Sequence, residues 1–435
     1  MVRHGGIVGS VNVHERTQAV MNMAVSIEQE GDIRSEPQEM PTSRLRTRAE
    51  AEAYVASVCF KHGPPRLVGV ELEWTVHHAE DLRKPLDTAL LNRALGPHAP
   101  DSLNPDSPHQ PLPNGSVLTL EPGGQVEISS PPHEAMDGLF AAVEADAEYL
   151  REAVERAGLV LGDRGIDPWR APRRVLSVPR YAAMQHAFDR IGSGGRRMMC
   201  STAGVQVCLD MGERERLEAR WAALHALGPV FTATFANSPV SLGAETGWAS
   251  ARARSLLHTD PPRTRPAPIT SDPARCWAGH VLDVPVVCLR RQSGDWTAPS
   301  GISFAEWIGG SLGEAPNRDD LDYHLSTMFP PVRPRGYFEV RYLDAQPGSE
   351  WMLPVAALTA LFRSETVVDK VLEETAPVAH RWVSAARDGL HDSEIARSAG
   401  AIFDLACRCL EAAPDAPSGL AERVAASVGR RLGAR

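Results

Sequence analysis

The sequence predicts an α+β fold in which a mostly antiparallel sheet is covered on one face by helices. Four segments alternate between polar and apolar residues with a period of two, which is typical of half-buried strands. Long segments with helical periodicity follow two of them, and everything beyond Leu353 is helical in period. With 435 residues, of which 43% are hydrophobic, the chain can bury a sizeable core.

The N-terminal residues 1–45 are polar and interrupted by Gly, Pro and Ser, which predicts a flexible leader. Residues 46–435 are predicted to form a single domain, which ends in a helical layer over about 354–435, with breaks at Pro377, Gly389 and 414–417. Before that layer we expect strands over 66–76, 202–210 and 337–343, and two more over 117–130 that are joined by a turn at Pro122–Gly124. We expect helices over 47–60, 134–157 and 213–227. A proline-rich loop is expected over 96–115, and a long loop that is a candidate lid over 259–275.

The charge composition excludes some classes of site. Of the 45 basic residues only three are lysines (Lys61, Lys84 and Lys370), which leaves 42 arginines. None of the three follows a glycine-rich loop or precedes Ser or Thr, so a Walker-type nucleotide site is excluded. A phosphate bound by this chain must be neutralised by arginine or metal.

The same composition bears on partners and location. A net charge of −10 gives no general attraction for nucleic acid or anionic membranes. The seven cysteines have irregular spacing without a C-x-x-C pair, and no apolar run resembles a signal peptide or a membrane span. We expect a cytoplasmic protein that acts on small molecules and has neither nucleic acid nor membrane as a partner.

Carboxylates and carboxamides gather on one face of the predicted strands, because alternate residues of a strand share a face. An ordinary wet sheet face carries lysine, threonine and mixed charge, whereas like charges on one face repel unless a cation lies between them. Oxygen ligands of this kind suit hard divalent cations, and arginine on the same face suits phosphate. The residues concerned are Glu71, Glu73, Glu121, Gln125, Glu127, Gln206 and Glu339, with Arg341 as the phosphate ligand.

Six motifs carry a resemblance to a known family. They are GVELE at 69–73, LEPGGQVEIS at 120–129, SVPRYAAM at 177–184, MMCSTAGVQVCLD at 198–210, FANSP at 235–239 and YFEVR at 337–341. In this order they resemble the glutamate–cysteine ligases of the plant and bacterial type, in particular the branch that supplies γ-glutamylcysteine for ergothioneine synthesis. The family belongs to the carboxylate–amine ligases with a glutamine-synthetase-like catalytic domain, in which a curved sheet forms a funnel-like active site.

The resemblance implies a reaction and a set of roles. ATP would activate the γ-carboxylate of glutamate as an acyl phosphate, and the amine of cysteine would then displace phosphate. Two or three Mg²⁺ ions, with Mn²⁺ as an alternative, would be held by Glu71, Glu73, Glu121, Gln125 or Glu127, Gln206 and Glu339. Glu339 and Arg341 would be catalytic, and the substrates would be bound by Arg180, Tyr181, Gln206, Arg252 and Arg254, of which Arg252 is expected at the glutamate α-carboxylate.

The sequence departs from the family at several positions. The third strand has Ala203 in place of the usual Cys, and the fourth reads YFEVRYLD where the family has FLEMRGAD. These departures concern the phosphate contacts after Arg341 and any redox regulation. Two further function classes stay open: a related carboxylate–amine ligase or guanidino kinase with another acceptor, and a non-catalytic metabolite-binding relative. A glycine-rich loop at 192–195, followed by Arg196 and Arg197, could also cradle a phosphate, although a flexible loop is the better interpretation.

Overall fold

The computed structural model describes residues 44–100 and 109–434. Its centre is an open, six-stranded sheet with the strand order β3-β4-β1-β6-β10-β9, and every pairing in it is antiparallel. The strands of this sheet are β1 (Val68–Trp74), β3 (Val117–Leu120), β4 (Val126–Ser129), β6 (Gly204–Leu209), β9 (Val332–Pro334) and β10 (Phe338–Asp344). Two small two-stranded sheets accompany it, formed by β2 (Val76–His78) with β5 (Leu159–Leu161) and by β7 (Val240–Ser241) with β8 (Ala244–Glu245). The predicted α+β class with an antiparallel sheet is confirmed.

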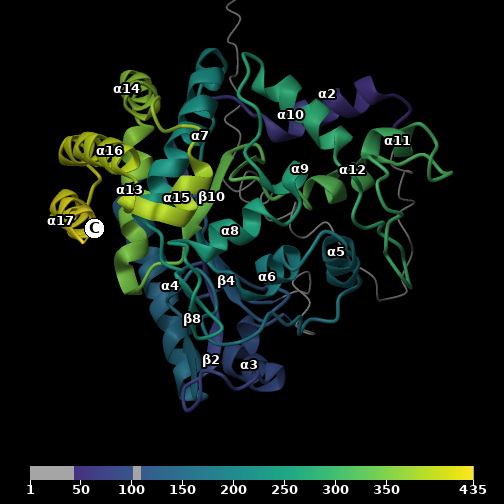
Figure 1. Ribbon diagram of the computed structural model, residues 1–435, viewed down its shortest axis with the longest axis horizontal. Coiled ribbons are helices and arrows are strands. Elements are labelled where there is room, and N and C mark those ends of the chain that lie inside the picture. The colour runs from purple at the N-terminus through teal and green to yellow at the C-terminus, as the bar shows by residue number, and fades with distance from the viewer. Residues whose placement is uncertain (1–43, 101–108, 435) are drawn as a thin grey trace, which may run out of the picture.

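Helices make up most of the remaining structure (Figure 1). In the first two thirds of the chain they are α2 (Arg48–Cys59), α3 (Thr88–Leu95), α4 (Met136–Arg156), α5 (Pro179–Asp189), α6 (Gly194–Ser201), α7 (Leu217–Thr234), α8 (Ala251–Leu257), α9 (Pro261–Thr264) and α10 (Pro273–Asp283). The later helices are α11 (Phe304–Ile308), α12 (Arg318–Leu325), α13 (Met352–Leu361), α14 (Glu365–Thr375), α15 (Trp382–Asp388), α16 (Ser393–Glu411) and α17 (Leu420–Gly433). No helix in the described ranges is long and apolar enough to cross a membrane.

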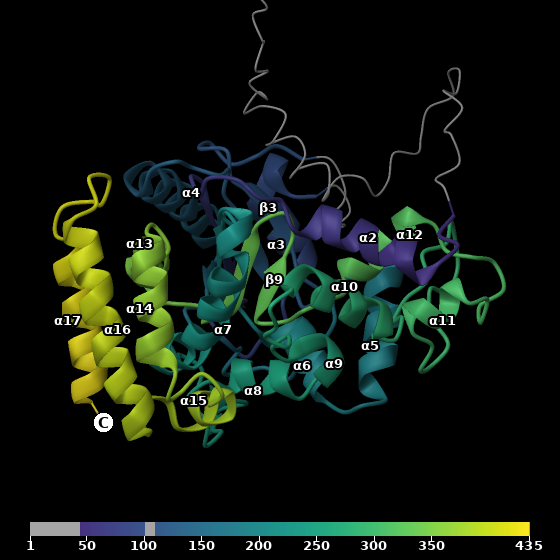
Figure 2. The same cartoon turned by 90° about the horizontal axis from the view of Figure 1, so that it is seen from above.

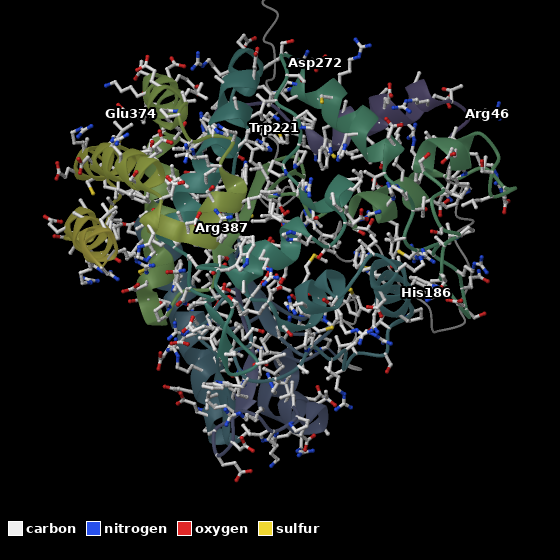
Figure 3. The ribbon with its side chains drawn as sticks, in the orientation of Figure 1. Arg46, His186, Trp221, Asp272, Glu374 and Arg387 are labelled. Atoms are coloured by element: carbon white, nitrogen blue, oxygen red, sulfur yellow. The ribbon has the colours of Figure 1, made fainter. Side chains whose placement is uncertain are left out.

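The apolar face of the sheet packs on helices α4, α7 and α13. Its side chains are almost fully buried: Val70, Leu72, Val126, Ile128, Val205, Val207, Phe338 and Val340. Trp221 of α7 lies between the rings of Phe60 and Phe338, with centroids 6.0 and 5.8 Å away. Figure 3 shows Trp221 close to the ribbons of the interior, while Asp272 and Glu374 point outward. One face of the sheet is therefore the core, and the other is left for polar residues.

From Met352 the described chain is helical, in α13 to α17, with breaks near Pro377, Gly389 and 414–417. Helices α16 and α17 lie side by side at one edge of the molecule, next to α13 and α14 (Figure 2). The amphipathic pattern of α16 explains this packing, because Ile395, Ile402 and Phe403 fall on one buried stripe.

Two predicted elements differ from the structure. Helix α7 does not end at Leu227 but continues through Gly228 and Pro229 to Thr234. Gly228 serves a packing contact there, because an added Cβ would come within 1.9 Å of the Trp382 ring. The predicted loop over 259–275 contains α9 and the start of α10, and Arg263 in it is completely buried, so we do not regard that part as a mobile lid.

Two predictions fall partly or wholly outside the description. Of the predicted leader, residues 1–43 lie outside the described residues. Leu45 is described, and it is buried with its N–H bonded to the Pro316 carbonyl. Of the proline-rich loop, residues 101–108 lie outside. That residues 46–435 form one domain stays a prediction, although a single hydrophobic cluster extends from Leu45 to Val428.

Candidate active site

The polar face of the sheet brings together the predicted carboxylates from strands far apart in the sequence. The register pairs Glu71 with Gln206 and Glu73 with Glu127 on neighbouring strands. Cross-strand partners point to the same side of a sheet, at Cβ separations of about 5 Å. Strand β10 adds Glu339, which is paired with Cys208 of β6. The alternation read from the sequence thus places these side chains on one surface.

Three glutamates on this face have raised pKa values, although arginines act on two of them, Glu71 and Glu121. Burial, followed by repulsion from neighbouring carboxylates, raises the pKa of Glu71 to about 7 and that of Glu121 to about 7. The pKa of Glu127 is raised well above its ordinary value for the same reasons, with Glu71, Glu121 and Glu73 as its neighbours. We call Glu71, Glu73, Glu121 and Glu127 the carboxylate half of the site.

Gln206 links the carboxylate half to the rest of the face. Its amide nitrogen donates to Glu73 at 2.7 Å and to Glu127 at 3.3 Å, and its carbonyl oxygen accepts from Arg341. Glu127 accepts a further hydrogen bond from the Thr119 hydroxyl at 2.8 Å. The amide therefore lies at the boundary between negative and positive side chains.

The opposite half of the face carries arginines around Glu339. Arg333 of β9 binds both oxygens of Glu339, with one contact of 2.8 Å, and Arg341 donates to the same carboxylate at 3.1 Å. Arg335 lies 3.7 Å from it. Burial alone would raise the pKa of Glu339, but the three guanidinium groups outweigh it and hold that pKa far below its usual range. We call Glu339, Arg333, Arg335 and Arg341 the arginine half.

This arrangement occupies both oxygens of Glu339 with guanidinium groups and leaves its side chain fully buried. In the described structure Glu339 therefore anchors Arg333 and Arg341, and its predicted role as a metal ligand stays a prediction. Arg333 was missed by the sequence reasoning. The signal was the V-R-P-R segment next to the fourth strand, but its prolines argue against a paired strand, and β9 is an edge strand, where proline is tolerated.

Strand β10 contains a β-bulge that sets which side chains face the site. Val340 pairs with Val207 but Leu343 pairs with Val205, so β10 has one extra residue between them. The extra residue moves Asp344, paired with Gly204, onto the polar face, whereas strict alternation would put it on the apolar face. Asp344 is accordingly, like Arg333 and Arg335, a site residue that the sequence reasoning missed.

Arg252 of α8 reaches the same face from above the bulge. It is 3% exposed, and one terminal nitrogen donates to the Arg341 carbonyl at 3.0 Å. Its Nε and its other terminal nitrogen are buried without a partner among the described residues. Gly204 makes room for it, because a Cβ at that position would come within 2.4 Å of the guanidinium. A buried guanidinium with two unused donor nitrogens is suited to bind a carboxylate.

Other predicted site residues lie elsewhere or are engaged differently. The Gln125 amide holds the turn, since it accepts from the Gly123 N–H at 3.0 Å and donates to the Thr202 carbonyl at 2.9 Å. Because backbone groups occupy both ends of its amide, we leave Gln125 out of the proposed metal set.

Arg254 does not join Arg252. Residues two apart on a helix point in nearly opposite directions, and the Arg254 guanidinium lies 5.2 Å from the centre of the Trp248 ring. There it lines a cavity of about 290 Å³ together with Arg197, His258 and the glycine-rich loop at 192–194. The carboxylates of the polar face do not line this cavity, so we leave Arg254 out of the proposed substrate site.

Arg180 and Tyr181 belong to the first turn of α5. Arg180 donates to the hydroxyl and the carbonyl of Ser326 at 2.8 and 2.9 Å and lies over the Tyr323 ring. Its charge is one of those that lower the pKa of Glu121, so it is electrostatically coupled to the carboxylate half. Tyr181 is buried beside it, 8% exposed.

Metal binding by these residues can be tested against their chemistry. In residues 44–100 and 109–434, no three His, Cys, Asp or Glu side chains are placed to hold an ion by themselves. The carboxylate half nevertheless offers only oxygen donors. Burial and, after it, repulsion between carboxylates raise the pKa values of Glu71, Glu121 and Glu127, and a cation would offset that repulsion. The donors fit Mg²⁺, which keeps several water or phosphate ligands besides one or two carboxylates.

Comparison with known proteins finds relatives that match most of this chain. The glutamate–cysteine ligase EgtA of Mycolicibacterium smegmatis is 38% identical over 353 residues, which are 80% of this chain and 81% of that protein. The enzyme of the same name from Mycobacterium tuberculosis H37Rv is 37% identical over 367 residues, or 82% of each chain. A solved glutamate–cysteine ligase from Francisella tularensis in complex with AMP shares the fold, with a TM-score of 0.52 at 13% identity, over 86% of this chain and 83% of that one.

The profile of the family described as Glutamate-cysteine ligase family 2 (GCS2) matches residues 67–431, which include both halves of the polar face, Arg252 and Asp344. The chain therefore belongs to the glutamate–cysteine ligase family 2.

Proposed function

We propose that this chain joins the γ-carboxylate of L-glutamate to the amine of L-cysteine, with ATP converted to ADP and phosphate. The observation that supports this assignment most strongly is the division of charge on one sheet face. On this one antiparallel sheet the pKa of Glu71 is raised, whereas the pKa of Glu339 is lowered. Such a face can hold cations beside anions, which is what a bound nucleotide with its metal ions requires.

The carboxylate half is the proposed metal site. Glu71, Glu73, Glu121 and Glu127 would supply carboxylate oxygens to two or three Mg²⁺ ions. We leave Gln206 out of the proposed metal set, because its carbonyl oxygen accepts from Arg341. Bound Mg²⁺ supplies positive charge that neutralises the phosphates of ATP and polarises the transferred group. Phosphate oxygens of ATP would add further ligands, because Mg²⁺ typically combines one or two carboxylates with phosphate and water.

The arginine half is the proposed site of the transferred phosphoryl group. Arg341 is held by Glu339 and Gln206 at the boundary of the two halves, so its guanidinium lies next to the proposed metal site. Its planar fork can donate two hydrogen bonds to phosphate oxygens. Arg333 fixes Glu339 from the other side and thereby keeps Arg341 in place.

Arg252 is the proposed ligand of the glutamate α-carboxylate. Its two unpartnered nitrogens lie beside the Arg341 backbone, so glutamate bound there would extend its γ-carboxylate along the face. In the first step an oxygen of that carboxylate attacks the γ-phosphorus of ATP, and the bond to the bridging oxygen breaks to release ADP. In the second step the cysteine amine attacks the acyl carbon, loses a proton, and phosphate leaves.

The product would be γ-glutamylcysteine, and we propose that it enters the synthesis of ergothioneine or a related thiol, as the resemblance implies. The experiment that tests the function is phosphate release from MgATP and glutamate with a panel of amino-acid acceptors, followed by mass analysis of the products. We expect release that needs both glutamate and cysteine. Release with another amine, or without glutamate, would contradict the proposal.

A further inference from the structure

A buried carboxylate lies directly behind the start of α8, the helix that carries Arg252. Asp344 is 2% exposed and accepts three hydrogen bonds. The donors are the Ser238 hydroxyl at 2.7 Å, the Ser250 hydroxyl at 2.8 Å and the Asn237 backbone N–H at 2.8 Å. Burial raises the pKa of the Asp344 carboxyl, whereas the charge of Arg252 and the three donors lower it. In the observed geometry all three hydrogen bonds are donated to Asp344, which acts as the acceptor.

The two serine hydroxyls connect Asp344 to the backbone of α8. Each has given its only proton to Asp344, so each oxygen is left as an acceptor. The Ser238 oxygen accepts from the backbone N–H of Arg252 at 3.2 Å, and the Ser250 oxygen accepts from that of Ala253 at 3.0 Å. Ser250 is the N-cap of α8. Asp344 therefore orients both hydrogen bonds that fix the first turn of this helix.

The position of Arg252 depends on that turn. Its guanidinium has one hydrogen bond, to the Arg341 carbonyl, and otherwise presents unused donor nitrogens. Asp344 also reaches the face only because of the bulge in β10, and it pairs with Gly204, whose missing side chain makes the space for Arg252. The bulge in β10, Gly204 and the two serines therefore all affect the position of Arg252.

We propose that Asp344 is a positioning residue for glutamate, which acts through Ser238 and Ser250 to fix the direction in which Arg252 presents its guanidinium. The inference rests on the proposed role of Arg252 in binding the α-carboxylate. It assigns a task to the FANSP motif at 235–239, which supplies two of the three groups bonded to Asp344.

The first test is Asp344→Asn in the full chain, with the KM values of glutamate and ATP measured separately. The asparagine amide group is a donor and would compete for a serine oxygen that now serves α8. We expect the glutamate KM to rise about fivefold or more, the fold-change that corresponds to a lost helix cap, while the ATP KM changes less than about twofold. An equal rise of both, or no rise, would overturn the inference.

A matched control is Asp146→Asn. Asp146 is equally buried and accepts from the backbone N–H groups of Asn114 and Ser116, on a different part of the fold. We expect this variant to lose thermal stability without a selective change in the glutamate KM. A selective change of the same size would mean that any lost buried carboxylate has this effect, and would overturn the inference.

A double-mutant cycle with Arg252→Lys tests whether Asp344 acts through Arg252. We expect Asp344→Asn to add little to the glutamate KM in the Arg252→Lys background, because the group that it positions is already gone. If the effects of the two substitutions on the glutamate KM were additive, Asp344 would not act through Arg252. If Asp344→Asn does not fold, Ser250→Ala and Ser238→Ala take its place: a rise in the glutamate KM alone supports the inference, and its absence overturns it.

Failure of the proposed role of glutamate as a substrate gives a different result. Calorimetric titration of the wild-type chain with L-glutamate in the presence of MgADP would then show no binding, and both proposals would fall together. If the wild type binds glutamate and Asp344→Asn binds it equally well, the inference about Asp344 fails and the proposed function stands.

Discussion

The two halves of the polar face contain the same residue type in opposite electrostatic states. In the carboxylate half, burial and mutual repulsion raise the pKa of Glu71 and Glu121 to about 7. In the arginine half, Glu339 is at least as buried, but three arginines keep its pKa far below the usual range. Burial acts on both halves, so the difference comes from the neighbouring charges.

This difference indicates what each half can bind. Carboxylates with raised pKa values are not fully compensated by the charges around them, and a cation that binds to their ionised form would lower their free energy. A carboxylate that is already neutralised by arginines gains little from a cation, and its role is to hold those arginines for an anion. The boundary between the halves is occupied by Gln206, which contacts both.

The largest effect is expected from the arginine half. Arg341→Lys should lower kcat by about a hundredfold or more, because a lysine cannot reproduce the two-pronged contact with a phosphoryl group. Steady-state kinetics at saturating MgATP would measure it, with the exposed Arg93→Lys of α3 as a control. A kcat close to that of the wild type would show that Arg341 does not contact the transferred group.

The next effect concerns Arg252. Arg252→Ala should raise the glutamate KM about 10- to 100-fold and the ATP KM much less, since a charge-assisted hydrogen bond to a carboxylate contributes about 1.5–3 kcal/mol. Separate KM measurements for the two substrates check this. If both KM values rose equally, Arg252 would act on the site as a whole and not on glutamate.

A smaller effect is expected in the carboxylate half. Glu127→Gln keeps the shape of the side chain and the contact with Thr119 but removes a charge. The Mg²⁺ concentration needed for half-maximal activity should rise about tenfold or more, as is typical when a metal site loses a ligand or its support. Activity measured against free Mg²⁺ would show this, and an unchanged requirement would remove Glu127 from the metal site.

The smallest effect is a pH dependence of stability without metal. The pKa of Glu71 and of Glu121 is raised from 4.5 to about 7 in the folded chain, so the folded state holds these protons more tightly than the unfolded state. Their contribution to stability is complete below pH 4.5 and is lost as the pH rises toward 7. The melting temperature should therefore fall over this interval, and Glu71→Gln should reduce the slope.

Mg²⁺ binds the ionised carboxylates, so it should reverse this trend. The rise in melting temperature caused by MgADP should be larger at pH 8 than at pH 6, as measured by thermal shift. A rise independent of pH would mean that these glutamates do not take part in metal binding.

Much of the site could be predicted from the sequence because strand alternation is a local property. Glu71, Glu73, Glu127, Gln206 and Glu339 fall on one face as their spacing indicates. Arg252 was inferred from the family resemblance, and the structure adds the reason why it suits a carboxylate, namely its unpartnered buried nitrogens.

The remaining features depend on pairing that the local sequence does not reveal. The bulge in β10 is visible only in the register with β6, and it alone decides on which face Asp344 lies. Arg333 belongs to an edge strand with a proline, which local propensity disfavours. Likewise, Gly228 and Pro229 resemble a helix end, but the close contact with Trp382 is a tertiary one.

Positional isotope exchange tests the central claim, that this face passes the γ-phosphoryl group of ATP to glutamate, most directly. ATP labelled with ¹⁸O in the β,γ-bridge would be incubated with the enzyme, Mg²⁺ and glutamate in the absence of cysteine. Reversible formation of γ-glutamyl phosphate should move the label into the non-bridging β-positions, and Arg341→Lys should suppress this exchange. Exchange that does not require glutamate, or its absence in an enzyme that makes γ-glutamylcysteine, would contradict the account.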